Sequence, residues 1–196
     1  MRPIPWWALA SAVAAPILLV GGWTIAASQQ PDGYNPISDT ISSLAAQGAT
    51  DRGVMTTALA GLGACYVITA AGLRPARFAG RLVLACGGLA TLLVAAFPQP
   101  VRGNSIAHST AAAVAFSALA AWPVFAARPR PCAPLLTHFA SGAATVFMLG
   151  LVLSFVLELH GGHRGLAERA AAGMEALWPL AVVVTSEFMI APAPQT

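Results

Sequence analysis

Four ionisable side chains in this sequence have the types and surroundings that acid–base chemistry needs. They are Asp39, His108, Glu168 and Glu175. Histidine changes its charge near neutral pH and can exchange a proton with a nearby carboxylate, so we predict proton transfer between Asp39 and His108. Both residues also have simpler interpretations. Asp39 can stabilise the positive end of a local helix, and His108 can bond to a backbone carbonyl.

Glu175 is the acid whose burial costs most. It follows Glu168 by about two helical turns on one face of the apolar segment near the end of the chain. Pro179 removes the backbone hydrogen bond to the carbonyl of Glu175 and so leaves an acceptor beside this acid. An ionisable residue inside an apolar helix faces protein or a cavity, so Glu175 predicts a place for a substrate polar group, a proton or an ion. The alternative is a neutral Glu175 bonded to a neighbouring helix.

Further polar and aromatic residues in the same regions predict ligand contacts. The expected substrate-binding residues are Ser38, Ser42, Arg102, Asn104, Arg169 and Trp178. The stretch ELHGGH also offers three zinc ligands, Glu158, His160 and His163, although this spacing occurs often by chance in loops. We predict no cofactor and keep zinc at these three residues as the alternative.

The elements that must position these residues are membrane-spanning helices. The chain has 196 residues, of which 57% are hydrophobic and 9% are charged. A soluble domain carries about 25% charged residues, so the composition excludes one. Apolar runs of about 20 residues cross a membrane as helices, and glycines such as Gly63 and Gly88 allow such helices to approach closely. We predict one all-α domain over residues 1–196, with six transmembrane helices at 4–27, 54–73, 82–97, 107–127, 135–157 and 166–190.

The arginines predict the orientation in the membrane, because they are retained in short cytoplasmic loops. Six fall on one predicted side: Arg2, Arg74, Arg77, Arg81, Arg128 and Arg130. The other four lie on the opposite side with five of the seven acidic residues. We therefore expect both termini in the cytoplasm and Asp39, His108 and Glu168 at the outer face of a prokaryotic plasma membrane.

The stretch NPISDTISSLAAQG, residues 35–48, predicts a short amphipathic helix at the outer face between the first two spans. Asn35 can cap this helix, and Gly48 can end it. Ile37, Ile41 and Leu44 would then form one apolar stripe directed toward the bilayer. A plain polar loop is the alternative, because capping also uses serine and aspartate.

Three motifs give the chain a family resemblance. They are NPISDTISSL, FPQPVRGNSIAHSTAAAVAF and GLAERAAAGMEALWPLAV. In this order they resemble a family of prokaryotic six-span membrane proteins known as domain of unknown function 998. The resemblance covers most of the chain and implies a six-helix membrane fold with a polar face shaped by Asp39, His108, Glu168 and Arg169. It implies no reaction.

Two functions agree with these residues. In the first, the protein is an intramembrane enzyme or binding protein that acts on a lipid or isoprenoid-like molecule by acid–base chemistry at its outer face. In the second, it is a noncatalytic membrane module, or a transporter of protons or small solutes, and its charges are structural. The expected partners are membrane lipids and a hydrophobic small molecule, and a transporter of this size would favour an oligomer. The formal charge of +3 follows from membrane orientation and gives no reason to expect nucleic-acid binding.

Overall fold

The computed structural model describes residues 4–129 and 133–190, and every regular element in these residues is helical. Six long helices carry the fold: α1 (Trp6–Ser28), α3 (Gly53–Gly72), α4 (Phe78–Ala96), α5 (Ile106–Ala126), α6 (His138–Leu157) and α7 (Arg164–Ile190). A short helix α2 (Ile41–Leu44) lies between α1 and α3, and a 3₁₀ turn η1 (Pro134–Leu136) precedes α6. Arg2 and Arg130, on which part of the orientation prediction rests, lie outside the described residues.

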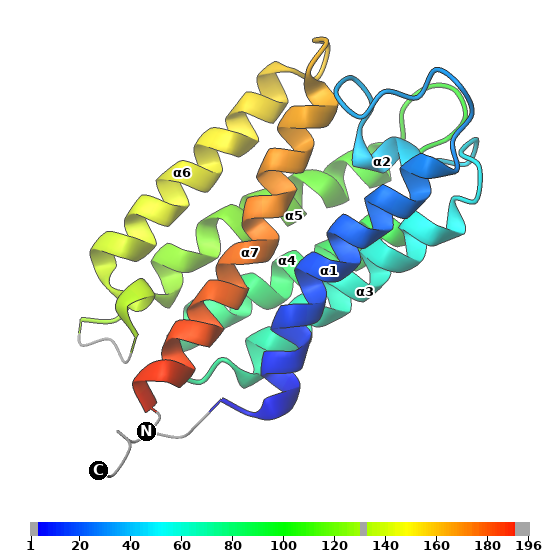
Figure 1. The fold of residues 1–196 in the computed structure, drawn as a ribbon. Coiled ribbons are helices and arrows are strands. Elements are labelled where there is room, and N and C mark those ends of the chain that lie inside the picture. The colour runs from blue at the N-terminus through cyan, green and yellow to red at the C-terminus, as the bar shows by residue number, and fades with distance from the viewer. Residues whose placement is uncertain (1–3, 130–132, 191–196) are drawn as a thin grey trace.

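The long helices run up and down and pack side by side as a ring (Figure 1). Each contacts the next along the chain, and contacts between α1 and α7 close the ring. The backbone N–H of Ile4, just before α1, donates to the carboxylate of Glu187 near the end of α7 at 2.7 Å. The start of α1 and the end of α7 therefore meet at one end of the bundle. The opposite end, which carries α2, is called the α2 end below.

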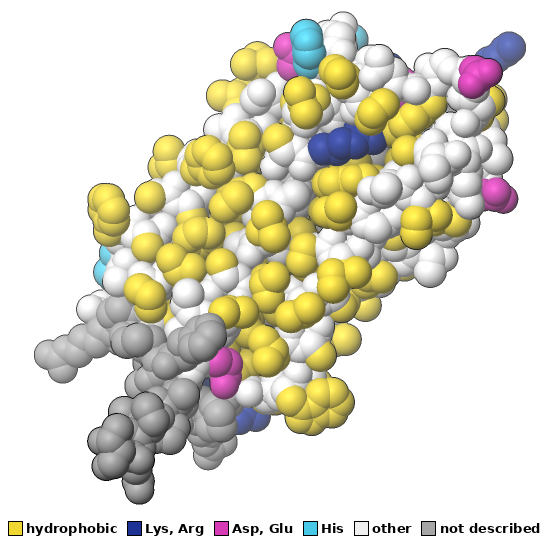
Figure 2. All heavy atoms as spheres, in the orientation of Figure 1, with side chains coloured by type: hydrophobic (Ala, Val, Ile, Leu, Met, Phe, Trp, Pro, Cys, Tyr) yellow, Lys and Arg dark blue, Asp and Glu magenta, His cyan; other side chains and the backbone are white. Residues whose placement is uncertain are grey.

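Five described helices, α1, α3, α4, α5 and α6, are long and apolar enough to cross a membrane. Hydrophobic side chains cover much of the face in Figure 2, and charged groups lie mostly toward its two ends. The prediction of apolar helices long enough to span a membrane is confirmed for these five. Helix α7 has 27 residues and includes five charged ones, Arg164, Glu168, Arg169, Glu175 and Glu187. Its crossing of the membrane, and the side on which each end lies, stay predictions.

The third predicted span begins earlier than expected. Helix α4 begins at Phe78 rather than at residue 82, so Arg81 lies inside its first turn. The Arg81 guanidinium donates to the carbonyl oxygens of Ala70 and Ala71 at 2.7 and 2.5 Å. These carbonyls end α3 and have no helical partner of their own, so Arg81 is held at the junction of the two helices by hydrogen bonding.

The prediction of a helix over residues 35–48 was wrong in the length of that helix. Only Ile41–Leu44 is helical, and Thr40 rather than Asn35 caps it, because the Thr40 side chain accepts from the backbone N–H of Ser43. The Asn35 side chain accepts from the N–H of Ile37 and so stabilises a separate turn. Ile41 and Leu44 are buried in the bundle core, whereas Ile37 is 47% exposed. The predicted stripe is therefore divided between the core and the surface.

Glycines bring α3 and α4 into backbone contact, as predicted. A Cβ atom added at Gly88 would lie 2.7 Å from the carbonyl oxygen of Gly63. We expect Gly88→Ala to lower the free energy of unfolding by about 1–3 kcal/mol, because the two helix backbones must separate. Gly142→Ala on α6 is the control, since a Cβ there meets nothing within 4 Å and alanine favours helix. Thermal unfolding in detergent tests both variants, and equal midpoints for the two would contradict this account of the packing.

Candidate functional site

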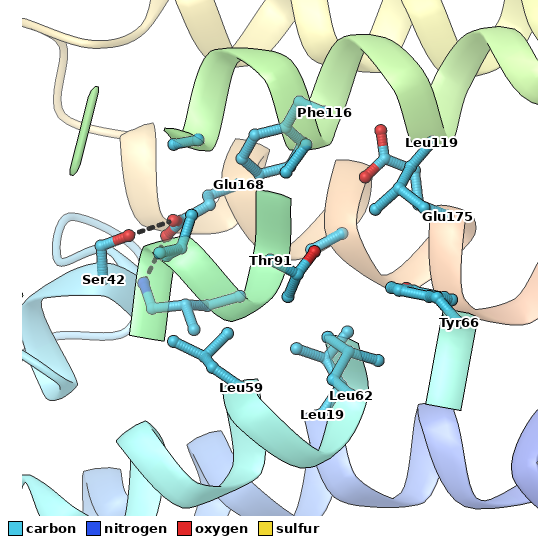
Figure 3. Close-up of a pocket in the computed structure, with 15 residues that line it drawn as sticks. Leu19, Ser42, Leu59, Leu62, Tyr66, Thr91, Phe116, Leu119, Glu168 and Glu175 are labelled. Carbon is cyan, nitrogen blue, oxygen red and sulfur yellow. Dashed lines mark hydrogen bonds between the residues drawn. The ribbon is translucent and has the colours of Figure 1, made fainter. Parts of the chain in front are cut away.

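A cavity lies inside the ring of helices, next to α2 (Figure 3). Its volume is about 60 Å³, which is room for roughly four waters or a short ligand segment. Most of its lining is apolar, from α1, α3, α4, α5 and α7. The polar side chains in the lining are Ser42, Tyr66, Thr91, Glu168 and Glu175. The arrangement is that of a small-molecule site, in which an apolar wall surrounds a few polar groups.

Glu175 lies on the α7 wall of the cavity and is 1% exposed. Its Oε1 atom has no hydrogen-bond partner in the described part of the chain. Figure 3 shows the carboxyl group beside Leu119, in the same space that the ring of Tyr66 borders. A buried oxygen without a partner costs about 1–3 kcal/mol of stability, so it marks a place where a bound molecule or water would supply the missing partner.

Glu168 lies closer to the α2 end on the same helix and is 3% exposed. Unlike Glu175, its carboxyl group is hydrogen-bonded, because it accepts from the backbone N–H of Ile41 and contacts the Ser42 hydroxyl at 3.2 Å. The Ser42 hydroxyl also contacts Nε2 of His108 at 3.2 Å. Glu168, Ser42 and His108 therefore form one connected chain of polar groups that begins at the cavity wall.

The ring orientation of His108 is fixed by the end of α4. Its Nδ1 atom lies 2.9 Å from the carbonyl oxygen of Phe97. A carbonyl oxygen only accepts, so the hydrogen must lie on Nδ1. In the neutral ring, Nε2 is then the free acceptor that faces Ser42. His108 is 2% exposed, so both contacts are shielded from solvent.

Arg169 attaches the loop of residues 34–40, which precedes α2, to the start of α7. Its guanidinium donates to the carbonyl oxygens of Pro36 and Asp39 at 2.7 and 2.8 Å, and to the Tyr34 hydroxyl at 2.5 Å. Burial raises the pKa of Tyr34 although Arg169 opposes this shift, so the phenol is neutral at physiological pH. A Cβ atom at Gly165 would overlap the carbonyl oxygen of Asp39, so the close approach of loop and helix requires glycine there.

The sequence of this site matches a known family. The model of the family described as protein of unknown function, DUF998, matches residues 12–185. The chain belongs to the DUF998 family. The resemblance found in the three sequence motifs is thereby confirmed, and the match includes every residue that lines the cavity of this DUF998 protein. Neither the curated proteins nor the solved structures gave a match to the chain.

Asp39 of this DUF998 protein lies in the loop itself. One of its carboxylate oxygens accepts from the backbone N–H of Asn35 at 2.9 Å, and the other is 3.8 Å from the Arg164 guanidinium. The Arg164 guanidinium also donates to the carbonyl oxygen of Ser38 at 2.7 Å. His108 has Ser42 and Phe97 as its partners instead. The structure thus gives Asp39 and His108 different partners.

The other predicted ligand-binding residues lie outside the cavity lining. Arg102 and Asn104 are exposed between α4 and α5, and Asn104 accepts from the hydroxyl of Ser109 at 3.0 Å. Trp178 is half-buried on α7, and its indole N–H has no partner among the described residues. It packs against a small cluster of apolar residues from α5 and α6.

The three alternative zinc ligands do not gather into a metal site. The carboxylate of Glu158 accepts from the backbone N–H of His163 at 3.2 Å, and His160 and His163 are exposed. Across residues 4–129 and 133–190, no three His, Cys, Asp or Glu side chains are close enough together to hold a metal ion.

Sequence reasoning did not identify the cavity residues from α3 and α4. Tyr66 and Thr91 both line the cavity, and both are buried. Two signals were present in the sequence, because Tyr66 is one of only two tyrosines and each residue puts a hydroxyl in the middle of an apolar helix. A polar side chain at such a position faces protein or a cavity rather than lipid.

Proposed function

We propose that this DUF998 protein binds a hydrophobic molecule in its central cavity and performs acid–base chemistry on a polar group of that molecule. The observation that carries the proposal is the unpartnered Oε1 atom of Glu175, which is buried beside a mainly apolar cavity. A carboxyl group in such a place is retained at a cost in stability, and function is the usual reason for retaining it.

The lining of the cavity favours a lipid or isoprenoid-like ligand. Apolar side chains such as Leu62, Phe116 and Leu119 surround the two acids, so the body of the ligand must be apolar. Four of the helices that line the cavity, α1, α3, α4 and α5, are of membrane-spanning length and composition, so a bilayer would be the source of the molecule. A hydroxyl or amine on the ligand would donate to Glu175.

Glu168 is the second acid that the ligand can reach. It stands about two turns from Glu175 on the same wall, and Ser42 links it to His108. A group that exchanges protons needs both a contact with the ligand and a partner that accepts or supplies the proton. Glu168 has both, so we assign it the acid–base role and assign Glu175 the role of holding the polar group.

Blocking the cavity tests this function directly. Ala115 lines the cavity, whereas Ala113 lies on the exposed face of the same helix. We expect Ala115→Phe to fill the cavity and to reduce the amount of co-purifying hydrophobic molecule at least tenfold, or about 1.4 kcal/mol of binding free energy. Ala113→Phe should leave that amount unchanged. Mass spectrometry of an organic extract from each purified protein measures the difference.

Two results would count against the proposal. Identical extracts from the wild type and Ala115→Phe would show that the cavity holds no such molecule. The transport alternative, in which the two acids carry protons across the bundle, would be favoured by a different pair of results. The wild type and Ala115→Phe would give identical extracts, and the wild type would conduct protons into liposomes while Glu175→Gln would not.

A further inference from the structure

We infer that Glu168, Ser42 and His108 form a relay that holds one shared proton, and that this proton is the one exchanged with a ligand in the cavity. The second part of the inference rests on the proposed function, and the first part does not. The relay joins three elements, since Glu168 belongs to α7, Ser42 to α2 and His108 to α5. Its two contacts are both 3.2 Å between heavy atoms.

The number of hydrogens in the relay follows from the chemistry of its groups. A serine hydroxyl has one hydrogen and therefore donates one hydrogen bond. Ser42 faces a carboxyl oxygen on one side and a ring nitrogen on the other. If Glu168 is ionised and His108 is neutral, both of these atoms are acceptors, and Ser42 satisfies only one of them. One of the two contacts then has no hydrogen between its atoms, so either Oε1 of Glu168 or Nε2 of His108 lacks a donor there, although Oε2 of Glu168 still accepts from the Ile41 N–H.

One additional proton satisfies both contacts, and it can do so in two forms. In the carboxyl form, protonated Glu168 donates to the Ser42 oxygen, and the Ser42 hydroxyl donates to Nε2 of His108. In the imidazolium form, Nε2–H donates to the Ser42 oxygen, and the Ser42 hydroxyl donates to ionised Glu168. Nδ1–H donates to Phe97 in both forms. The two forms carry the same net charge, so the exchange between them moves protons only along the relay.

A second additional proton is less favourable. It would protonate both Glu168 and His108, so that both donate to the Ser42 oxygen and the Ser42 hydrogen needs another acceptor. The other charged and titratable groups nearby are committed elsewhere. Arg169 on α7 donates to loop carbonyls and Tyr34, Asp39 accepts within its own turn, and Tyr66 and Glu175 lie further along the cavity. The relay therefore favours one proton.

The two forms give Glu168 two chemical roles at the cavity wall. In the carboxyl form, Glu168 can transfer its proton to a basic atom of the ligand, which leaves the relay with no additional proton. In the imidazolium form, ionised Glu168 can remove a proton from an acidic ligand group, which leaves the relay with two. His108 and Ser42 need not touch the ligand, and they act as positioning residues that determine which form Glu168 takes.

Counting the proton on the empty protein tests the relay. The full chain in lipid nanodiscs, labelled with ¹⁵N-histidine, would be measured at a pH of about 7 by NMR and by infrared spectroscopy. We expect one of two results. Either a protonated-carboxyl band is present that Glu168→Gln removes and Glu175→Gln does not, or His108 has hydrogens on both ring nitrogens. Glu168→Gln is expected to leave His108 neutral with its hydrogen on Nδ1, because glutamine donates to Ser42 as protonated Glu168 would.

The serine link has a matched control in the next residue. The Ser43 hydroxyl donates to the Thr40 carbonyl oxygen at 2.6 Å and takes no part in the relay. We expect Ser42→Ala to shift the Nε2 resonance of His108 and Ser43→Ala to leave it in place. Ionised Glu168 together with neutral His108 in the wild type would overturn the inference, as would an Nε2 resonance that Ser42→Ala does not change. Neither measurement requires a ligand. A cavity that proves empty, together with a relay that holds its proton, would refute the proposed function and leave the relay standing.

Discussion

Replacing Glu175 by leucine is expected to make this protein more stable while it loses its ligand. Leucine has no polar atoms, and its side chain suits the apolar neighbours that line the cavity, such as Leu62 and Leu119. The substitution removes a buried oxygen that has no partner among the described residues. We expect the free energy of unfolding to rise by about 1–3 kcal/mol, which is the usual cost of an unsatisfied buried polar group. Thermal unfolding in detergent without added lipid measures the change.

Glu175→Gln separates shape from charge in this experiment. Glutamine keeps the volume and adds two N–H donors, which also find no partner in an empty cavity, so we expect no gain in stability from it. Both variants should lose the co-purifying hydrophobic molecule. A strongly destabilised Glu175→Leu protein would show that the carboxyl group has a structural partner and would remove the main support for the proposed site.

The membrane helices were predictable because their signal is strong and local. A run of about 20 apolar residues has few alternatives to a spanning helix, and five such runs became α1, α3, α4, α5 and α6. Boundaries were less predictable where a side chain makes a tertiary contact. Arg81 resembled a residue before a span, yet its hydrogen bonds to the end of α3 hold it inside the first turn of α4.

The loop before α3 shows the limit of local reasoning more clearly. Its sequence permits a helix from residue 36, but Arg169 binds the carbonyl oxygens of Pro36 and Asp39. Thr40 then provides a second cap that begins α2 only at Ile41. The contacts of Arg169 join residues 130 or more positions apart along the chain, so no local pattern reveals them. Glu168, Ser42 and His108 were each expected at the polar face, but the direct link between them depended on the same folding of the loop.

Replacing Arg169 by alanine is expected to release this loop from α7. The guanidinium donates to the carbonyl oxygens of Pro36, Asp39 and Gly165 and to the hydroxyl of Tyr34. Its charge also lies 5.8 Å from the centre of the Trp23 ring, which adds a cation–π attraction. A hydrogen bond to a charged group contributes about 1.5–3 kcal/mol when it is well shielded. Arg169 is half-buried, so we expect a total loss of about 2–4 kcal/mol rather than the sum of four such bonds.

In Arg169→Ala, the loop should lose its order first, and the contacts of Glu168 with Ile41 and Ser42 should weaken as a consequence. Ile41 and Ser42 follow this loop as the first residues of α2 and bind Glu168, so loss of Arg169 removes the support that holds them there. Hydrogen–deuterium exchange should become faster for residues 34–42 while the middle of α3 and α4 stays protected.

Arg169→Lys tests the geometry of the contacts. One ammonium group cannot reach two carbonyls and Tyr34 in the fork arrangement of arginine, so lysine should restore only part of the protection. Arg102→Ala is the control for charge alone, since Arg102 is exposed between α4 and α5. Equal exchange in the Arg102 and Arg169 variants would mean that the loop is held by its apolar contacts, chiefly the burial of Ile41 and Leu44, and that Arg169 adds only charge to this end of the bundle.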